Sequence, residues 1–115
     1  PNIITINLGT NDRSAGADTT QLEQRFYEFL TELRTLHPQS WILVLRSFHG
    51  FWENNENKIV EQRKQSGDKK IAFIDTTGWL DLKTDYTDGT HPNPLGHRKA
   101  ADKLVPILKQ YLNKK

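Results

Sequence analysis

The chain opens with PNIITINL, residues 1–8, an apolar run rich in β-branched residues that ends at Gly9. Such a run predicts a β-strand that is buried on both faces. Two further apolar runs, residues 41–45 and 71–74, predict a second and a third strand. Helical patterns lie between and after these runs, and this alternation favours right-handed crossovers and a parallel sheet. We therefore expect an α/β fold.

Two helices are predicted between the strands. In the first, residues 20–23 fit a capping box, and His37-Pro38 ends the helical pattern. The residues expected to face the core are Leu22, Phe26, Phe29, Leu30 and Leu33. The second helix, residues 55–66, is weakly patterned; Ile59 and Val60 are its expected core residues, and Gly67 is its stop signal.

The last helix is predicted to begin at Asn93-Pro94, an N-cap residue followed by proline at the first helical position. Pro106 is expected to kink this helix or to split it in two, because proline removes a backbone donor. The expected buried stripe comprises Leu95, Ala101, Leu104, Val105, Leu108 and Leu112.

Composition limits the classes of function. The 115 residues are 35% hydrophobic and 26% charged, which suits one domain or part of one. A net charge of +2 is small, so we do not expect nucleic acid as a partner. The absence of cysteine excludes disulfides, thiolate catalysis and cysteine zinc sites. No apolar run approaches the roughly 20 residues of a membrane span. The compartment stays open, with a secreted or periplasmic location favoured over a cytoplasmic one.

Two short motifs follow predicted strands, where α/β folds place their active sites. The first is Gly9-Thr10-Asn11-Asp12, in which glycine permits a close turn and Asn11 offers an amide N–H donor. A simple turn explains the same residue types.

The second motif is Asp88-Gly89-Thr90-His91-Pro92, in which a carboxylate precedes an imidazole by three residues. A carboxylate bonded to one ring nitrogen leaves the other free as a base. The alternative is a helix-entry loop in which Asp88 makes an Asx-type turn and His91 only packs, and for an isolated D-x-x-H this structural explanation is the commoner one.

Aromatic side chains follow the second predicted strand. Phe48, His49 and Trp52, together with Phe51, are expected at the site end of the sheet, where they would line an acyl or sugar pocket. The alternative is a loop folded back onto the core. His97 is expected to be a surface or capping residue on the last helix.

Together, the segments G-T-N-D at 9–12 and D-G-T-H-P at 88–92 resemble two conserved blocks of the SGNH, or GDSL-type, hydrolase superfamily. The resemblance covers nearly the whole chain and includes the helix P-L-G-H-R-K-A-A-D-K-L after the histidine. It implies a three-layer α/β/α, flavodoxin-like fold, of which residues 1–115 are the C-terminal part with the last three strands. The first strand would then have an unpaired edge.

The resemblance also implies roles for individual residues. His91 matches the general base, Asp88 the acid that orients it, and Asn11 the side-chain donor of the oxyanion hole. Gly9 matches the glycine of its block, and Asp12 is expected to support the loop by hydrogen bonding. The implied activity is ester hydrolysis by a serine, without metal or cofactor. The sequence is most similar to bacterial carbohydrate esterases that remove acetyl groups, so an acetylated carbohydrate is the favoured substrate. Lysophospholipase and thioesterase activities stay open, because no residue decides between them.

The chain lacks the G-D-S block that carries the nucleophilic serine in the family. We expect that serine, with further strands, on an upstream segment, and this chain alone to be inactive. Of the four serines, Ser14, Ser40, Ser47 and Ser66, only Ser47 is expected at the site edge of the sheet.

Two other functions stay open. One is a non-catalytic module of the same fold that binds carbohydrate or protein. The other is a metal-dependent hydrolase with ligands among Asp12, Asp88, His91 and His97.

Overall fold

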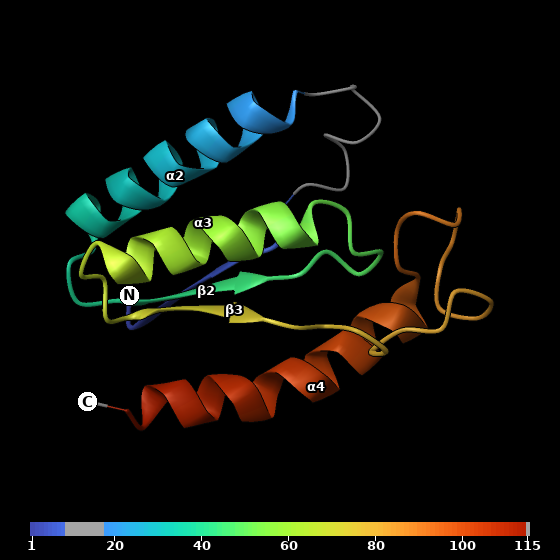
Figure 1. Ribbon diagram of the computed structural model, residues 1–115. Helices are drawn as coiled ribbons and strands as arrows, with labels where there is room; N and C mark the ends of the chain where they lie inside the picture. The colour runs from blue at the N-terminus through green and yellow to red at the C-terminus, as the bar shows by residue number, and fades with distance from the viewer. Residues whose placement is uncertain (9–17, 115) are drawn as a thin grey trace.

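The computed structural model describes residues 1–8 and 18–114 of the chain. Its elements alternate in the order β1 (Ile3–Ile6), α2 (Thr19–Leu36), β2 (Trp41–Leu45), α3 (Glu53–Gln65), β3 (Ile71–Ile74) and α4 (Pro94–Leu112). The three strands are parallel and lie in the order β1-β2-β3. Helices α2 and α3 cover one face of the sheet and α4 covers the other (Figure 1). The predicted three-layer α/β/α arrangement is confirmed.

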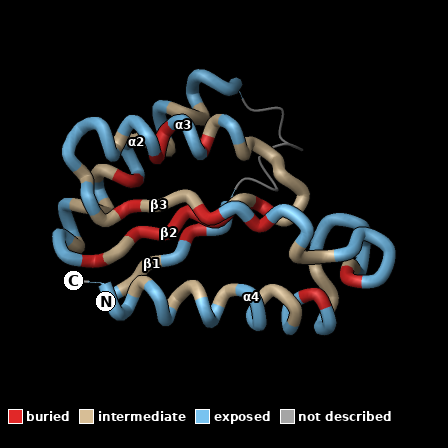
Figure 2. The backbone as a smooth tube through the Cα atoms, turned by 60° about the horizontal axis from the view of Figure 1, so that its bottom comes forward, coloured by how far each residue is buried: buried red, intermediate tan, exposed pale blue. Residues whose placement is uncertain are grey.

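Strand β2 is the centre of the core, and Figure 2 shows buried residues along this strand. Ile42 and Val44 pack toward α2 and α3, whereas Leu43 and Leu45 pack toward α4. This alternation follows from the period of two in a strand. Because both faces of β2 are covered by helices, every position from 42 to 45 is apolar.

Strand β1 differs from its prediction. Ile6 is buried, but Ile3 and Ile4 are half-buried and Thr5 is exposed, so the prediction of burial on both faces is wrong. Within residues 1–8 and 18–114, β1 pairs with β2 alone. An edge strand with a single neighbour has fewer elements to cover it. The predicted unpaired edge is therefore present in the described structure.

Helix α2 begins earlier than predicted. Its N-cap is Asp18, whose carboxylate accepts the N–H groups of Thr20 (2.8 Å) and Gln21 (3.1 Å). The capping box beginning at Thr20 is therefore wrong, because an acceptor two residues upstream satisfies the first turn. Glu23 instead bonds α3, through Lys58 and Asn55.

The predicted core face of α2 is largely confirmed. Leu30 is fully buried, and Phe26 and Leu33 pack against the same cluster. Phe29 is an exception, since 39% of it is exposed. Tyr27 packs against the core cluster as well, which shows that the buried stripe is rotated toward α3.

Helix α3 contributes Ile59 and Val60 to the core, as predicted. It begins two residues before the expected start and ends at Gln65. Gly67 follows it with a φ of 108°, a backbone conformation that favours glycine, so the predicted stop signal is confirmed.

Helix α4 begins as predicted, with Asn93 as the N-cap accepting the N–H of Gly96 (2.8 Å) and Pro94 in the first turn. Pro106 lies inside the helix and does not split it. The predicted buried stripe is only partly correct, because the helix packs on the sheet mainly through its C-terminal half. Leu104 and Leu108 contact the core, as do two residues outside the prediction, Ile107 and Tyr111. The exposed members of the stripe are Leu95, Ala101, Val105 and Leu112.

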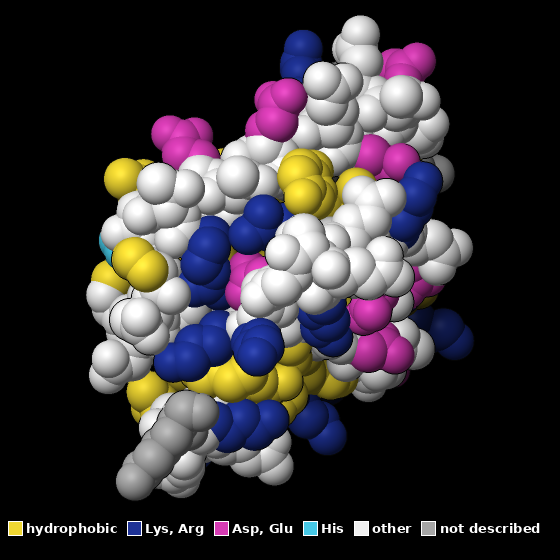
Figure 3. Space-filling model, turned by 60° about the vertical axis from the view of Figure 1, so that its left-hand side comes forward, with side chains coloured by type: hydrophobic (Ala, Val, Ile, Leu, Met, Phe, Trp, Pro, Cys, Tyr) yellow, Lys and Arg dark blue, Asp and Glu magenta, His cyan; other side chains and the backbone are white. Residues whose placement is uncertain are grey.

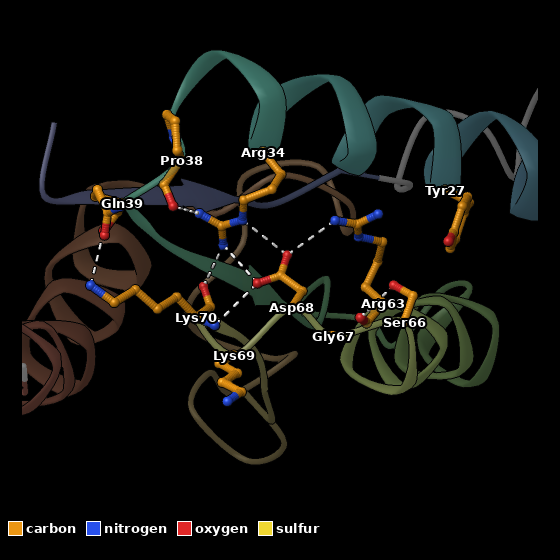
Figure 4. A pocket seen from close by; sticks show the side chains of 10 residues that line it. All are labelled: Tyr27, Arg34, Pro38, Gln39, Arg63, Ser66, Gly67, Asp68, Lys69 and Lys70. Carbon is orange, nitrogen blue, oxygen red and sulfur yellow. Dashed lines mark hydrogen bonds and ion pairs between the residues drawn. The ribbon is translucent and has the colours of Figure 1, made fainter.

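At the amino end of the sheet, one carboxylate joins three elements (Figure 4). Asp68 accepts two hydrogen bonds from Arg34 of α2, both 3.0 Å long, and one of 3.4 Å from Arg63 of α3. It also accepts the N–H of Lys70, which leads into β3 (3.1 Å). Lys and Arg side chains gather on this face (Figure 3). Because only 2% of the Asp68 side chain is exposed, these bonds fix the helices to the sheet.

None of the helices in residues 1–8 and 18–114 is both long and apolar enough to cross a bilayer.

Candidate active site at the carboxyl edge of the sheet

Parallel strands end at the same edge of a sheet, so the segments that follow them lie at that edge. Residues 46–52 follow β2, and residues 75–93 follow β3 and lead into α4 (Figure 1). The predicted residues Gly9, Asn11 and Asp12 follow β1 in the sequence but lie outside the described residues. The described part of the site therefore consists of residues 46–52 and residues 75–93.

Asp88 and His91 are brought together. The Asp88 Oδ2 atom lies 2.9 Å from Nδ1 of His91. The other oxygen, Oδ1, accepts the N–H groups of Thr90 (2.9 Å) and His91 (2.7 Å). The predicted Asx-type turn and the predicted carboxylate–imidazole pair are thus both present, because each uses a different oxygen of one carboxylate.

These contacts determine the charge of Asp88. The hydrogen bond from the His91 side chain, followed by the N–H groups of His91 and Thr90, holds the pKa of Asp88 well below its ordinary value. Asp88 is therefore an acceptor over the physiological pH range, and its partner nitrogen Nδ1 carries the proton. In the neutral imidazole this arrangement leaves the lone pair on Nε2. Among the described residues no group bonds Nε2, and 61% of the His91 side chain is exposed.

The aromatic segment after β2 lies against the segment that carries this pair. The ring of His49 stacks on Phe51, with centroids 5.3 Å apart, and lies 4.7 Å from the ring of Tyr86. Phe48, His49 and Trp52 are all half-buried. Tyr86 was not anticipated as part of the site, because a single aromatic residue in an irregular segment has no periodic pattern to reveal it.

Arg46 stiffens the same segment. Its guanidinium donates to Glu53 (2.7 Å) and to the carbonyl oxygens of Ser47 (3.3 Å) and Phe48 (3.2 Å). Gly50 has a φ of 79°, and a side chain there would run into the guanidinium. Trp52 has a positive φ of 63°, which is uncommon for a bulky residue. The segment is therefore held in one conformation beside Tyr86.

The described serines are bonded elsewhere. Ser47 is fully buried and donates to the carbonyl oxygen of Phe51 (3.2 Å). Ser40 donates to the Pro1 carbonyl, and Ser66 donates to that of Arg63 (2.8 Å). Ser14 lies outside the described residues. None of the three described serines is hydrogen-bonded to the imidazole of His91.

A metal-dependent hydrolase requires several donor side chains around one point. In residues 1–8 and 18–114, no group of three or more His, Cys, Asp or Glu side chains is placed to hold a metal ion. Of the four ligands considered, Asp88 and His91 are together, Asp12 is not described, and His97 is exposed on α4.

Comparison with known proteins identifies the family. Residues 1–99 match the model of the GDSL-like lipase/acylhydrolase family. The chain belongs to this family. That match confirms the resemblance noted in the sequence and covers both motifs, Gly9 to Asp12 and Asp88 to Pro92.

The chain spans only a part of the length of the esterases that it matches. The chain is 27% identical to the cellulase/esterase CelE of Acetivibrio thermocellus and 27% identical to a multidomain esterase of Ruminococcus flavefaciens. Each match covers 97% of this chain but only 14% and 16% of the respective relatives. Among solved structures, a family two carbohydrate esterase from Clostridium thermocellum, in complex with cellohexaose, matches with a TM-score of 0.86 and 28% identity. That match covers 97% of this chain and 36% of the solved one.

Proposed function

We propose that this chain is the C-terminal part of a serine ester hydrolase domain, in which His91 is the general base and Asp88 orients it. The observation that carries the proposal is the 2.9 Å contact between Asp88 Oδ2 and His91 Nδ1. This contact fixes the tautomer that leaves Nε2 unprotonated. Membership of an acylhydrolase family supports the same chemistry. The nucleophilic serine is assigned to polypeptide outside residues 1–115.

The reaction proceeds in two halves. The serine oxygen attacks the ester carbonyl carbon while His91 Nε2 takes the hydroxyl proton. The tetrahedral intermediate then collapses, and His91 returns the proton to the departing alcohol, which leaves an acyl-enzyme. In the second half, water attacks the acyl carbon with His91 again as base. The acid is released and the serine is restored. Asn11 is assigned to the oxyanion, with Gly9 and Asp12 supporting its loop.

The proposed substrate is an ester on a carbohydrate, and an acetyl group is the favoured acyl group. Relatives of this chain are carbohydrate esterases, and one was solved with a bound cello-oligosaccharide. In this chain, the half-buried aromatic segment with Phe48, His49 and Trp52 lies beside the Asp88–His91 loop and offers flat ring faces to a sugar. Such a substrate favours a secreted or periplasmic location over a cytoplasmic one.

The experiment is acetate release from acetylated xylan, with hydrolysis of p-nitrophenyl acetate in parallel. It compares this chain alone, a longer polypeptide that adds the preceding segment of the domain, and the same polypeptide with His91→Ala. We expect turnover only in the unsubstituted longer polypeptide, unaffected by EDTA. Full activity of the His91→Ala variant would show that another group is the base. Loss of activity in EDTA would instead favour metal chemistry.

A second candidate is a carbohydrate-binding module without turnover. It is favoured by one observation, that the described serines bond to carbonyl groups and not to His91. Cello-oligosaccharide binding by a longer polypeptide that releases no acetate would support this candidate over the esterase.

A further inference from the structure

A second carboxylate lies in the segment that carries the proposed base. Asp85 is fully buried, three residues before Asp88. Its side chain accepts the N–H of Asp81 (2.7 Å) and the hydroxyl of Thr84 (3.0 Å). The Lys99 ammonium group of α4 donates to both carboxylate oxygens at 2.9 Å. The reaction proposed above uses neither Asp85 nor Lys99.

The backbone of Asp85 closes a loop. Its carbonyl oxygen accepts the N–H of Asn93 (2.8 Å), the residue that caps α4. The Asn93 side-chain amide donates to the Thr84 carbonyl (2.8 Å). Gly96, in the first turn of α4, lies so close that a side chain there would run into the Asp85 carbonyl. The two ends of segment 85–93 therefore meet on the first turns of α4.

Bonds within the loop connect this base to its tip. Tyr86 forms an antiparallel bridge with Pro92, and the Thr87 N–H donates to the carbonyl oxygen of His91 (2.9 Å). The tip holds Asp88 and His91, whose side chains are 54% and 61% exposed. Because little packs against the tip, its position depends on the base of the loop.

We propose that Lys99 is a positioning residue for His91, acting through Asp85. This inference rests on the proposed function. A buried carboxylate is unstable without a counter-charge. Removal of the Lys99 ammonium group leaves Asp85 with the Asp81 N–H and the Thr84 hydroxyl alone, so its carboxylate turns toward water or becomes protonated. Either change opens the base of the loop and displaces the Asp88–His91 pair. A displacement of about 1 Å at a catalytic group typically lowers the rate on the order of 100-fold.

The test compares Lys99→Met with Lys103→Met, both in the longer polypeptide that contains the whole domain. Lys103 is an exposed lysine of the same helix and has no partner among the described residues, so its removal controls for the loss of a charge. We expect Lys99→Met to lower kcat by about 10- to 100-fold with KM changed less than about twofold. Lys103→Met should leave both values unchanged, and Lys99→Arg should recover most of kcat because it restores the charge.

A structural readout separates positioning from general loss of stability. In nitrogen NMR spectra of this chain, His91 should show a protonated, hydrogen-bonded Nδ1, and Lys99→Met should weaken that signal while Lys103→Met preserves it. If Lys99→Met does not fold, Asp85→Asn provides the second route. The amide removes the buried charge, so adding Lys99→Met to Asp85→Asn should have little further effect on the His91 signal or on kcat.

Either of two results would overturn the inference: a folded Lys99→Met protein with the kcat of Lys103→Met, or an unchanged Nδ1 signal. A different result would show that the proposed function itself is wrong. In that case His91→Ala keeps full activity, and the Nδ1 signal still reports whether Lys99 fixes the loop.

Discussion

The ring of His49 lies 4.7 Å from the ring of Tyr86, and this contact joins two segments that leave different strands. His49 follows β2, and Tyr86 lies two residues before Asp88. The Tyr86 hydroxyl is buried without a hydrogen-bond partner among the described residues. Tyr86 therefore contributes to the site through its ring, and burial raises the pKa of its phenol.

Removing the hydroxyl and removing the ring of Tyr86 should have different effects. Tyr86→Phe is expected to change the free energy of unfolding by less than about 1 kcal/mol, because it deletes an unsatisfied polar atom. Tyr86→Ala should cost about 3 kcal/mol through the lost ring. Urea unfolding measures both. A Tyr86→Phe protein that loses as much stability as Tyr86→Ala would reveal a hydroxyl partner.

Substitutions in the Asp88–His91 pair should abolish turnover without unfolding the protein, because both side chains are largely exposed. In the longer polypeptide, His91→Ala and Asp88→Asn should each lower kcat by about 10³- to 10⁴-fold on p-nitrophenyl acetate. The matched control is His97→Ala, which removes an exposed imidazole from α4. Equal losses in the control and in His91→Ala would point to a metal site or to a structural effect.

Asp68 should be important for stability and not for catalysis, since it lies just before β3, whereas Asp88 lies in the segment that follows β3. Asp68→Ala leaves the guanidinium groups of Arg34 and Arg63 without their shared acceptor. We expect a loss of about 3 kcal/mol in the free energy of unfolding, as for a broken buried ion pair. Asp102→Ala, on an exposed position of α4, should change it by less than about 0.5 kcal/mol. An Asp68→Ala protein as stable as this control would contradict the structure.

The protein should lose stability in acid. The folded structure lowers the pKa of Asp68, Asp85 and Asp88 below the ordinary value of 3.8, because each carboxylate accepts hydrogen bonds in its charged form. Below about pH 4 the unfolded chain therefore binds more protons than the folded chain. Stability should be constant with respect to these groups above about pH 5 and should fall as the pH drops below 4.

Urea titrations at pH 3, 4, 5 and 7 measure this dependence. Asp68→Asn should show a smaller acid loss than the unsubstituted chain, since one of the titrating groups is gone. An acid loss of the same size in both proteins would show that Asp68 is not paired in the folded state.

The strands and the cap of α4 could be predicted because their signals are local. Residues 41–45 are apolar throughout, as a strand covered on both faces requires, and Asn93-Pro94 forms the start of α4 as expected. Features that depend on distant neighbours were missed. Thr5 is exposed because β1 has one partner strand in the described structure, and Val105 is exposed because α4 packs mainly by other residues.

In the candidate site, too, the local contact could be predicted and the contacts between distant positions could not. The contact between Asp88 and His91 spans three residues and was expected from the sequence. The contacts of Tyr86 with His49 and of Asp85 with Lys99 link positions 37 and 14 residues apart. No periodicity or short motif marks such pairs, so they became visible only in the folded chain.

In the proposed reaction, His91 serves a serine on polypeptide outside residues 1–115. The most direct measurement treats the longer polypeptide with a serine-directed phosphonate and locates the labelled residue by peptide mass spectrometry. We predict one labelled serine upstream of Pro1, with labelling at least about 100-fold slower in His91→Ala. Labelling at Ser14, Ser40, Ser47 or Ser66, or an unchanged rate in His91→Ala, would contradict this account.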